Sequence, residues 1–351
     1  MIRHKTRKVV VGGVGIGGNN PVRVQSMCNT KTEDVEATIK QIKQLEEAGC
    51  ELVRVAVPNF RAVEALPEIR KNISIPLIAD IHYDYRLALA SIPYVDKLRI
   101  NPGTLGSKDK IRAIVERAKQ YKVAIRVGIN TGSLERRVKA RLKNNVDTML
   151  ASVAENIRLL ERLGFEDIIV ALKSSDVVET IEAYRRFSKQ YDYPLHLGLT
   201  EAGLGLSGAI RSAIAIGVLL SEGIGDTIRV SLTGNPVEEV RAAYDILSAL
   251  KLREYGAVLV SCPTCSRCSV DLLRIVKEVK QHISSIKKPI KIAIMGCEVN
   301  GPGEAKEADV GLAFSHSKGF LFKHGKIIQR VEQSEAIPAL IRLIDNTLNS
   351  S

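Results

Sequence analysis

Tryptophan is absent from this chain, and aromatic residues make up only 4% of its 351 residues. Proteins that bind single-stranded nucleic acids stack bases on aromatic side chains, so this composition argues against that function. The longest apolar run, near Ala213–Leu220, is far shorter than the ~20 residues that a membrane-spanning helix needs. We therefore expect a cytoplasmic protein with no nucleic-acid partner and no membrane segment.

Six cysteines in a cytoplasmic protein do not form a disulfide framework, because the cytoplasm keeps thiols reduced. Cys28 and Cys50 stand alone among small or apolar neighbours, which predicts two buried free thiols. The other four gather near the C-terminus, as is typical of a metal site. They are Cys262, Cys265, Cys268 and Cys297.

The chain carries a formal net charge of +12 without any long block of Lys or Arg. Such basicity usually serves nucleic acid, an anionic membrane surface or an anionic small molecule. Because the low aromatic content argues against single-stranded nucleic acid and the basic residues are spread along the chain, we expect phosphates on a small ligand. A non-enzymatic protein that binds duplex nucleic acid through its basic surface is the alternative, and its binding would weaken steeply with salt.

Short β-branched runs alternate with amphipathic helical patterns from residue 22 onward. Eight such repeats predict parallel βαβ units, and therefore an α/β fold built on a (β/α)₈ TIM barrel. An open doubly wound sheet is the competing fold, but it normally opens with a glycine-rich phosphate loop that residues 25–29 lack. The expected strands are Val22–Ser26, Leu52–Val57, Leu77–Ile81, Lys97–Ile100, Ala124–Ile129, Ile168–Leu172, Leu195–Leu199 and Thr227–Leu232.

The pattern changes near residue 255, which predicts two domains, a barrel over 1–250 and a small α+β domain over 251–351. In the second domain, Gly256–Val260 and Lys291–Met295 are expected strands that each lead into cysteines. A hairpin is expected at Gly319–Val331, turning on His324-Gly325. At the other end of the chain, the glycine-rich segment 9–18 predicts a short hairpin.

Polar residues follow or interrupt most of the barrel strands, where catalytic groups of this fold lie. Five basic residues inside strands are hard to explain by packing, because a buried charge is costly unless it is paired or bound to a ligand. Few carboxylates are near enough in the sequence to neutralise them: Asp80, Glu201 and Asp84. Arg presents a planar fork to phosphate oxygens, so the pattern favours a diphosphate ligand. The basic residues are Arg54, Arg99, Arg126, Lys173 and Arg229.

Period-two alternation places Asn101 on the face of Arg99, Asn130 on that of Arg126, and Ser231 on that of Arg229. His82 and His196 are candidates for acid–base groups or for buried core histidines. The glycine-rich segment Thr200–Gly208 precedes an expected helix starting at Ala209, and its amides could cradle a phosphate.

The spacing Cys262-x₂-Cys265-x₂-Cys268, with Cys297 as a fourth thiol, suits either a structural zinc ion or an iron–sulfur cluster. The turn at 300–303 could return Glu304 towards the metal. A carboxylate is a weaker ligand than a thiolate, so a substrate could displace it. This favours a catalytic cluster over a closed zinc site.

With these residues laid out, the chain resembles the 4-hydroxy-3-methylbut-2-enyl diphosphate synthase family of the methylerythritol phosphate route to isoprenoids. The resemblance covers nearly the whole chain. It rests on the motifs at 29–34, 79–86, 99–103, 128–135, 200–203, 221–227, 262–265 and 300–304.

The resemblance implies an oxidoreductase with a [4Fe–4S] cluster on Cys262, Cys265, Cys297 and Glu304, which leaves Cys268 as an extra thiol. It implies reductive ring opening of 2-C-methyl-D-erythritol 2,4-cyclodiphosphate with loss of water, in which a substrate oxygen replaces Glu304 on the iron and Glu201 is our candidate proton donor. The five basic residues would hold the diphosphate. The remaining expected binding residues are Asp80, His82, Asn101, Asn130, Thr200 and Ser231.

The resemblance further implies a homodimer and an electron donor that is ferredoxin or flavodoxin. The rival interpretation is a zinc-stabilised TIM-barrel transferase acting on a phosphorylated or pterin substrate. A radical SAM enzyme is disfavoured because its C-x₃-C-x₂-C signature is absent.

Overall fold

The computed structural model describes residues 3–131, 144–299, 303, 306–315 and 318–350. The chain divides into two compact units, Met1–Arg253 and Glu254–Ser351. Among the described residues, no helix is long and apolar enough to cross a membrane.

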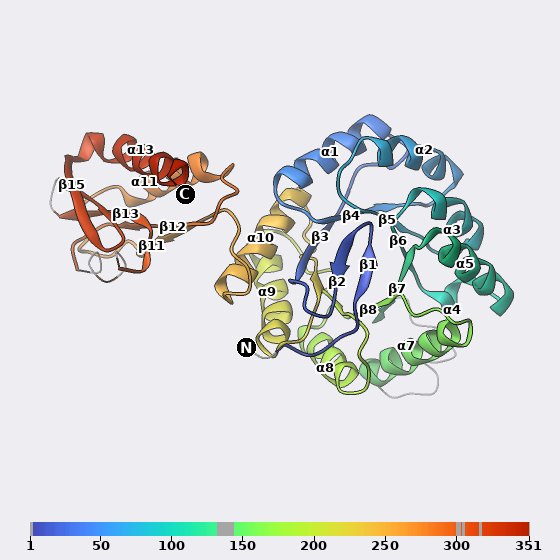
Figure 1. Cartoon of the computed structure of the whole chain (residues 1–351). Helices are drawn as coiled ribbons and strands as arrows, with labels where there is room; N and C mark the ends of the chain where they lie inside the picture. The colour runs from blue at the N-terminus through green and yellow to red at the C-terminus, as the bar shows by residue number, and fades with distance from the viewer. Residues whose placement is uncertain (1–2, 132–143, 300–302, 304–305, 316–317, 351) are drawn as a thin grey trace. The chain divides into compact units, whose positions relative to one another are not determined.

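The first unit is built around eight parallel strands in the spatial order β8-β7-β6-β5-β4-β3-β10-β9. A parallel bridge between Val170 of β8 and Leu195, just before β9, brings the two ends of the sheet together. Figure 1 shows the resulting ring of strands surrounded by helices, which confirms the predicted (β/α)₈ barrel. The strands are β3 (Arg23–Met27), β4 (Leu52–Ala56), β5 (Leu77–Asp80), β6 (Lys97–Ile100), β7 (Ala124–Asn130), β8 (Ile168–Lys173), β9 (His196–Leu197) and β10 (Thr227–Ile228).

The helices around the barrel begin where side chains can cap them. Asp34, Asn59, Asp176 and Asn235 each accept a hydrogen bond from a backbone N–H in the first turn of the helix that follows. The helices are α1 (Val35–Glu47), α2 (Phe60–Lys71), α3 (Tyr85–Ser91), α4 (Pro102–Leu105), α5 (Lys108–Tyr121), α7 (Asn145–Arg162), α8 (Val177–Ser188), α9 (Gly205–Ser221) and α10 (Pro236–Ala249), with the 3₁₀ turn η1 (Ile92–Tyr94).

A hairpin of β1 (Val9–Val11) and β2 (Val14–Ile16) lies across one end of the barrel (Figure 1). It turns on Gly12 and Gly13, which both have positive φ, as a two-residue turn of this kind requires. The predicted N-terminal hairpin is therefore confirmed. Its buried side chains pack on Leu52, Ile78, Ala124 and Ile169 from the barrel strands.

Two barrel strands are markedly shorter than predicted and one helix begins earlier, whereas the other barrel strands agree with their predicted bounds to within one residue. β9 and β10 stop at Leu197 and Ile228, and beyond β10 the amide of Leu232 donates to a side-chain oxygen of Glu239 at 2.9 Å instead of to a strand. Helix α9 begins at Gly205 instead of Ala209, so the end of the glycine-rich segment is itself helical.

The second unit is a five-stranded sheet in the order β11-β12-β13-β14-β15, covered on one face by α11 (Leu272–Ile283) and α13 (Ala336–Asn349). The first three strands are parallel and the last two antiparallel. The predicted hairpin turn at His324-Gly325 is confirmed. The strands are β11 (Ala257–Ser261), β12 (Ile290–Met295), β13 (Val310–Ser315), β14 (Lys318–Lys323) and β15 (Lys326–Glu332).

Candidate active site

A cavity of about 250 Å³ opens at the C-terminal ends of the barrel strands, where enzymes of this fold bind their substrates. Every barrel residue that the sequence analysis selected for binding or catalysis lines it, except Asn101. The lining residues are Arg54, Asp80, His82, Arg99, Arg126, Asn130, Lys173, Leu199, Thr200, Glu201, Arg229 and Ser231.

Asn101 was expected to continue the alternation of strand β6, but it is not among the residues that line the cavity. The strand ends at Ile100 and the chain enters the short helix α4 directly, so the period-two pattern stops there. Asn101 is buried, and its side-chain oxygen lies 3.5 Å from the amide nitrogen of Asn156 on α7.

Positive charge exceeds negative charge in the walls of the cavity. Arg54, Arg99, Arg126 and Lys173 are all buried, and Arg229 is largely so. Within the described residues, the buried carboxylates that pair with these cations are those of Asp80 and Glu239. No ion pair to Arg126 or Lys173 is found in this part of the chain, so the site is poised for an anionic ligand.

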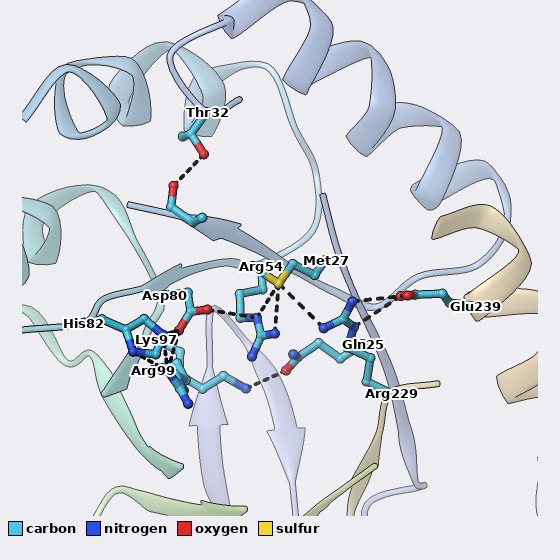
Figure 2. A network of polar contacts seen from close by, with 11 residues as sticks. Gln25, Met27, Thr32, Arg54, Asp80, His82, Lys97, Arg99, Arg229 and Glu239 are labelled. Carbon is cyan, nitrogen blue, oxygen red and sulfur yellow. Dashed lines mark hydrogen bonds and ion pairs between the residues drawn. The ribbon is translucent and has the colours of Figure 1, made fainter. Parts of the chain in front are cut away.

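Asp80 lies at the centre of one part of the charge network (Figure 2). Its carboxylate lies 3.2 Å from Nη1 of Arg99, 3.8 Å from Nε of Arg54 and 3.5 Å from Nε2 of His82. Burial alone would raise the pKa of Asp80, but Arg54, the His82 hydrogen bond and Arg99 together hold it far below its usual range. Asp80 therefore stays ionised and holds Arg99 and His82, while its contact with Arg54 is longer. Asp84 is not part of this network, because it caps α3 and pairs with Arg86.

Arg229 is held from outside the strand layer by Glu239, which the sequence analysis did not select. Nε and Nη2 of Arg229 donate to the two carboxylate oxygens of Glu239, each at 3.2 Å. Glu239 also accepts hydrogen bonds from the hydroxyl of Ser26 and the amide of Leu232. A buried carboxylate with this many donors is fully satisfied, so it fixes Arg229 in place.

Lys97 is a second charged residue that the analysis of strand ends did not select. It is 0% exposed, and its ammonium donates to the side-chain oxygen of Gln25 at 3.2 Å (Figure 2). Its signal was available, since period two places it on the same face as Arg99. His196 is also fully buried and bonds Thr227 through Nδ1 at 2.8 Å, which fits a core histidine beneath the cavity.

The cations of the site depress one another's pKa values. Burial lowers the pKa of Arg54 to about 10, against the opposing effect of Asp80. Burial, followed by repulsion from Arg126 and Arg54, lowers the pKa of Lys173 well below its ordinary value. Arg126 is affected in the same direction by burial and by Arg54 and Arg99. A guanidinium remains charged in proteins, so this repulsion persists until an anion binds.

Two glycines make room for the cations. A Cβ atom on Gly128 would lie 3.0 Å from Nε of Arg99. A Cβ atom on Gly198 would lie 2.6 Å from Nζ of Lys173 and 2.7 Å from the carbonyl oxygen of Arg229. The second contact involves backbone, which cannot move aside as a flexible side chain can.

The Gly198→Ala variant is therefore expected to displace Lys173 and the segment after β10. We expect inorganic pyrophosphate to bind at least about tenfold more weakly, and the free energy of unfolding to fall by about 1–3 kcal/mol. Titration calorimetry and denaturant unfolding measure the two effects.

Gly217→Ala is the matched control, because its Cβ would meet nothing within 4 Å in α9. That variant should bind pyrophosphate normally and gain about 0.5–1 kcal/mol of stability. Equal pyrophosphate affinity in both variants would contradict the packing argument.

Positive φ angles, which L-residues rarely take, occur at Glu201 in the cavity lining and at Tyr83, directly after the lining residue His82. Glu201 has φ of 52° and Tyr83 has φ of 64°, and both side chains are exposed. Such backbone conformations cluster at functional sites, where surrounding structure maintains them. Glu201 thus lies at the cavity edge, accessible to a bound ligand.

A second hollow, of about 470 Å³, lies around Arg7 and Tyr193. Arg7 pairs there with Asp192 and lies over the ring of Tyr193, and the Tyr193 hydroxyl donates to Glu161. Because these charges are already paired and the hollow is open to solvent, it offers no comparable attraction for an anion.

Four cysteines of the second unit lie near the C-terminal ends of neighbouring parallel strands. Cys262 directly follows β11, and Cys297 follows β12 after Gly296. The sulfur of Cys262 accepts a hydrogen bond from the amide of Gly296 at 3.3 Å, and Cys265 is exposed. Thiols at strand ends, one of them accepting a backbone hydrogen bond, are the groups that bind an iron–sulfur cluster in proteins.

Cys268 has a hydrogen-bond acceptor in the backbone of its own loop. Its thiol donates to the carbonyl oxygen of Val270 at 3.3 Å, and a Cβ on Gly296 would lie 2.4 Å from its sulfur. In the described part of the chain, no three His, Cys, Asp or Glu side chains already surround one point as a metal site. The expected fourth ligand, Glu304, lies outside the described residues.

The two isolated cysteines of the barrel are buried, as predicted. Burial raises the pKa of both Cys28 and Cys50 to about 12. Thiols that remain protonated are poor nucleophiles and poor metal ligands, so these two have no part in the site.

A (β/α)₈ barrel whose mouth carries buried, uncompensated cations defines an enzyme of the barrel class that acts on an anionic substrate. Comparison with protein families then identifies the chain. The GcpE TIM-barrel domain matches residues 6–244, and the GcpE protein C-terminal domain matches residues 258–346. The chain belongs to the GcpE family, and the resemblance predicted from its motifs is confirmed.

Curated relatives match almost end to end. A protein of Geobacillus kaustophilus (strain HTA426) is 53% identical over 345 residues, covering 98% of this chain and 92% of the relative. One of Thermodesulfovibrio yellowstonii is 53% identical over 344 residues, covering 97% and 99%. Both are named 4-hydroxy-3-methylbut-2-en-1-yl diphosphate synthase (flavodoxin).

More distant solved structures share the barrel fold alone. The N-acetylneuraminic acid synthetase of Leptospira borgpetersenii is 12% identical, with a TM-score of 0.52 over 80% of this chain and 98% of that one. Dihydropteroate synthase of Stenotrophomonas maltophilia is 13% identical, with a TM-score of 0.52 over 70% and 97%. At such identities the second similarity does not support a pterin substrate, and the zinc-stabilised transferase is not favoured.

Proposed function

We propose that this chain is an oxidoreductase that opens the ring of 2-C-methyl-D-erythritol 2,4-cyclodiphosphate reductively, with loss of water, to give 4-hydroxy-3-methylbut-2-enyl diphosphate in isoprenoid biosynthesis. The observation that carries this proposal is the excess of buried positive charge around the barrel cavity, which suits a diphosphate. The names of the curated relatives support the particular reaction.

The buried cations hold the diphosphate in this mechanism. Among the described residues, Nε and Nη1 of Arg126 and Nε of Arg99 are buried without a hydrogen-bond acceptor, which leaves their positive charge uncompensated beside the cavity. Lys173 adds a point charge, and Asn130, Thr200 and Ser231 would donate further hydrogen bonds from the cavity wall. Because the donors are fixed in advance, little reorganisation accompanies binding.

Glu201 would hold and release a proton at the cavity edge. Its exposed carboxyl lies among the residues that line the cavity and has no ion-pair partner in the described chain. His82 and Asp80 would orient the bound substrate through Arg99. When bound by Cys262, Cys265, Cys297 and Glu304, a [4Fe–4S] cluster would supply single electrons and a Lewis-acidic iron.

Anaerobic purification followed by turnover assays tests this function. We expect a protein with about four iron and four sulfide per chain that converts the cyclic diphosphate when reduced flavodoxin is supplied. The Glu201→Gln variant should retain the cluster and lose most turnover. Full turnover by this variant would remove its role as proton donor, and a colourless zinc protein would overturn the redox reaction itself.

Substrate binding is expected to be coupled to proton uptake through Lys173. Burial lowers its pKa in the free protein, and a bound anion raises it again towards 10.5. Between these two pKa values, binding takes up protons, so affinity for the cyclic diphosphate falls as pH rises. Calorimetry in buffers of different ionisation enthalpy measures the uptake. Lys173→Arg is the control, because a guanidinium keeps its proton. Equal uptake in this variant would assign the proton to another group.

We also propose a cytoplasmic homodimer that receives its electrons from flavodoxin, with ferredoxin as the second candidate donor. The flavodoxin proposal is supported by the names of the relatives. The dimer proposal is supported by an apolar stripe on α9, where Leu206, Ile210 and Ile214 recur every fourth residue and are all exposed.

The Leu206→Glu variant is expected to shift the protein from dimer to monomer. Leu206 is 78% exposed in the single chain, so a charge there would be tolerated by the fold but not by an apolar interface. Light scattering measures the mass. Leu273→Glu on α11 is the control, since that side chain is 59% exposed and lies outside the stripe. If both variants remain dimeric, α9 is not the interface.

A further inference from the structure

Met27 ends strand β3 and lies between two of the arginines that line the cavity (Figure 2). Its sulfur accepts from Nε and Nη2 of Arg54 at 3.0 and 2.8 Å, and it lies 3.6 Å from Nη1 of Arg229. One uncharged atom therefore contacts two guanidinium groups that repel each other, and this repulsion contributes to the lowered pKa of Arg54.

Arg229 is the fixed member of this pair. Its two hydrogen bonds to Glu239 use Nε and Nη2, which leaves Nη1 directed towards the sulfur. Glu239 is itself 3% exposed and anchored by Ser26 and Leu232, so it cannot follow a moving arginine. Glu239 on α10 thus determines where Arg229 lies in the cavity wall.

Among the residues that the structure describes, no comparable anchor holds Arg54. Asp80 is 3.8 Å from its Nε and is shared with Arg99 and His82, so the sulfur is the nearer acceptor. A thioether is a weak, uncharged acceptor. It can orient the guanidinium without neutralising it. A carboxylate or amide at this position would compete with the phosphate oxygens of a ligand for Arg54. A hydrocarbon side chain would offer no acceptor to orient the guanidinium of Arg54.

We propose that Met27 is a positioning residue of the anion site, whose sulfur sets the orientation of Arg54 relative to the anchored Arg229 so that both meet one diphosphate. This inference rests on the proposed function for the identity of the substrate, but the geometry applies to any diphosphate. Met27 acts on the substrate through the two arginines, so it should influence binding and leave the later chemistry unchanged.

The test compares Met27→Leu and Met27→Gln in anaerobically purified protein, using inorganic pyrophosphate as the probe in titration calorimetry. Leucine keeps the volume and removes the acceptor, so we expect about tenfold weaker pyrophosphate binding. Glutamine supplies a strong acceptor that occupies Arg54, so we expect a loss of about thirtyfold or more. The KM for the cyclic diphosphate should rise in parallel, with kcat and iron content within about twofold of the parent.

Met149→Leu is the matched control, because Met149 is fully buried in α7, away from the cavity lining. It should bind pyrophosphate as the parent does. Parent-like binding by both Met27 variants, or a fall in kcat at constant KM, would overturn the proposal. If the parent does not turn over the cyclic diphosphate but its pyrophosphate affinity depends on Met27, the proposed function fails and the positioning role stands.

Discussion

Serine in place of Cys297 is expected to give a colourless protein with less than about 1% of the parent's turnover. A hydroxyl is a far poorer iron ligand than a thiolate. Cys297 follows the end of β12, next to Gly296, whose amide donates a hydrogen bond to the sulfur of Cys262. Iron and sulfide assays after anaerobic purification, together with the visible spectrum, measure the loss of the cluster.

Cys268→Ser provides the contrast for that experiment. Its thiol already donates to the carbonyl of Val270, and a serine hydroxyl can make the same hydrogen bond. We expect this variant to retain its iron and most of its activity. The ligand assignment would be wrong if Cys268→Ser lost the cluster while Cys297→Ser kept it.

Arg126→Met is expected to abolish diphosphate binding and at the same time to stabilise the ligand-free protein. Arg126 is buried, two of its nitrogens have no acceptor among the described residues, and Arg54 and Arg99 repel it. Each unsatisfied buried polar group costs about 1–3 kcal/mol, so we expect the free energy of unfolding to rise by about that amount. Denaturant unfolding and pyrophosphate calorimetry measure the two changes, which have opposite signs.

Arg112→Met separates this effect from a general loss of positive charge. Arg112 lies on α5, more than half exposed, in an ion pair with Asp109 at 3.5 Å. Surface pairs of this kind contribute little, so its stability should change by less than about 0.5 kcal/mol and its pyrophosphate affinity should stay the same. A destabilised Arg126→Met protein would contradict the conclusion that the charge of Arg126 is uncompensated in the free protein.

Most of the barrel follows from local rules that the sequence displays. The alternation of β-branched runs with amphipathic helices predicts the strand order, and β6 and α1 occur at the predicted bounds. The basic residues could be assigned to the cavity because the carboxyl ends of parallel barrel strands meet at one face. Period-two alternation places Asn101 beside Arg99, but the strand ends at Ile100 and Asn101 does not line the cavity.

The residues that support the arginines could not be found in the same way. Glu239 stands in the first turn of α10, where an acidic residue is expected simply to complement the helix dipole. In the sequence, Met27 cannot be distinguished from the other apolar residues of a strand. Their contacts depend on how α10 packs behind β3 and β10, which is a property of the assembled barrel and not of any local pattern.

The hairpin at the start of the chain covers the end of the barrel opposite the cavity. Val9, Val11 and Ile16 are almost completely inaccessible to water and pack an apolar layer across the strand beginnings. The interior of a barrel of this class is filled with side chains, so the hairpin extends an apolar core and does not close a channel. The two ends of the barrel therefore have separate tasks: the apolar end contributes to stability, and the charged end presents cations to an anionic ligand.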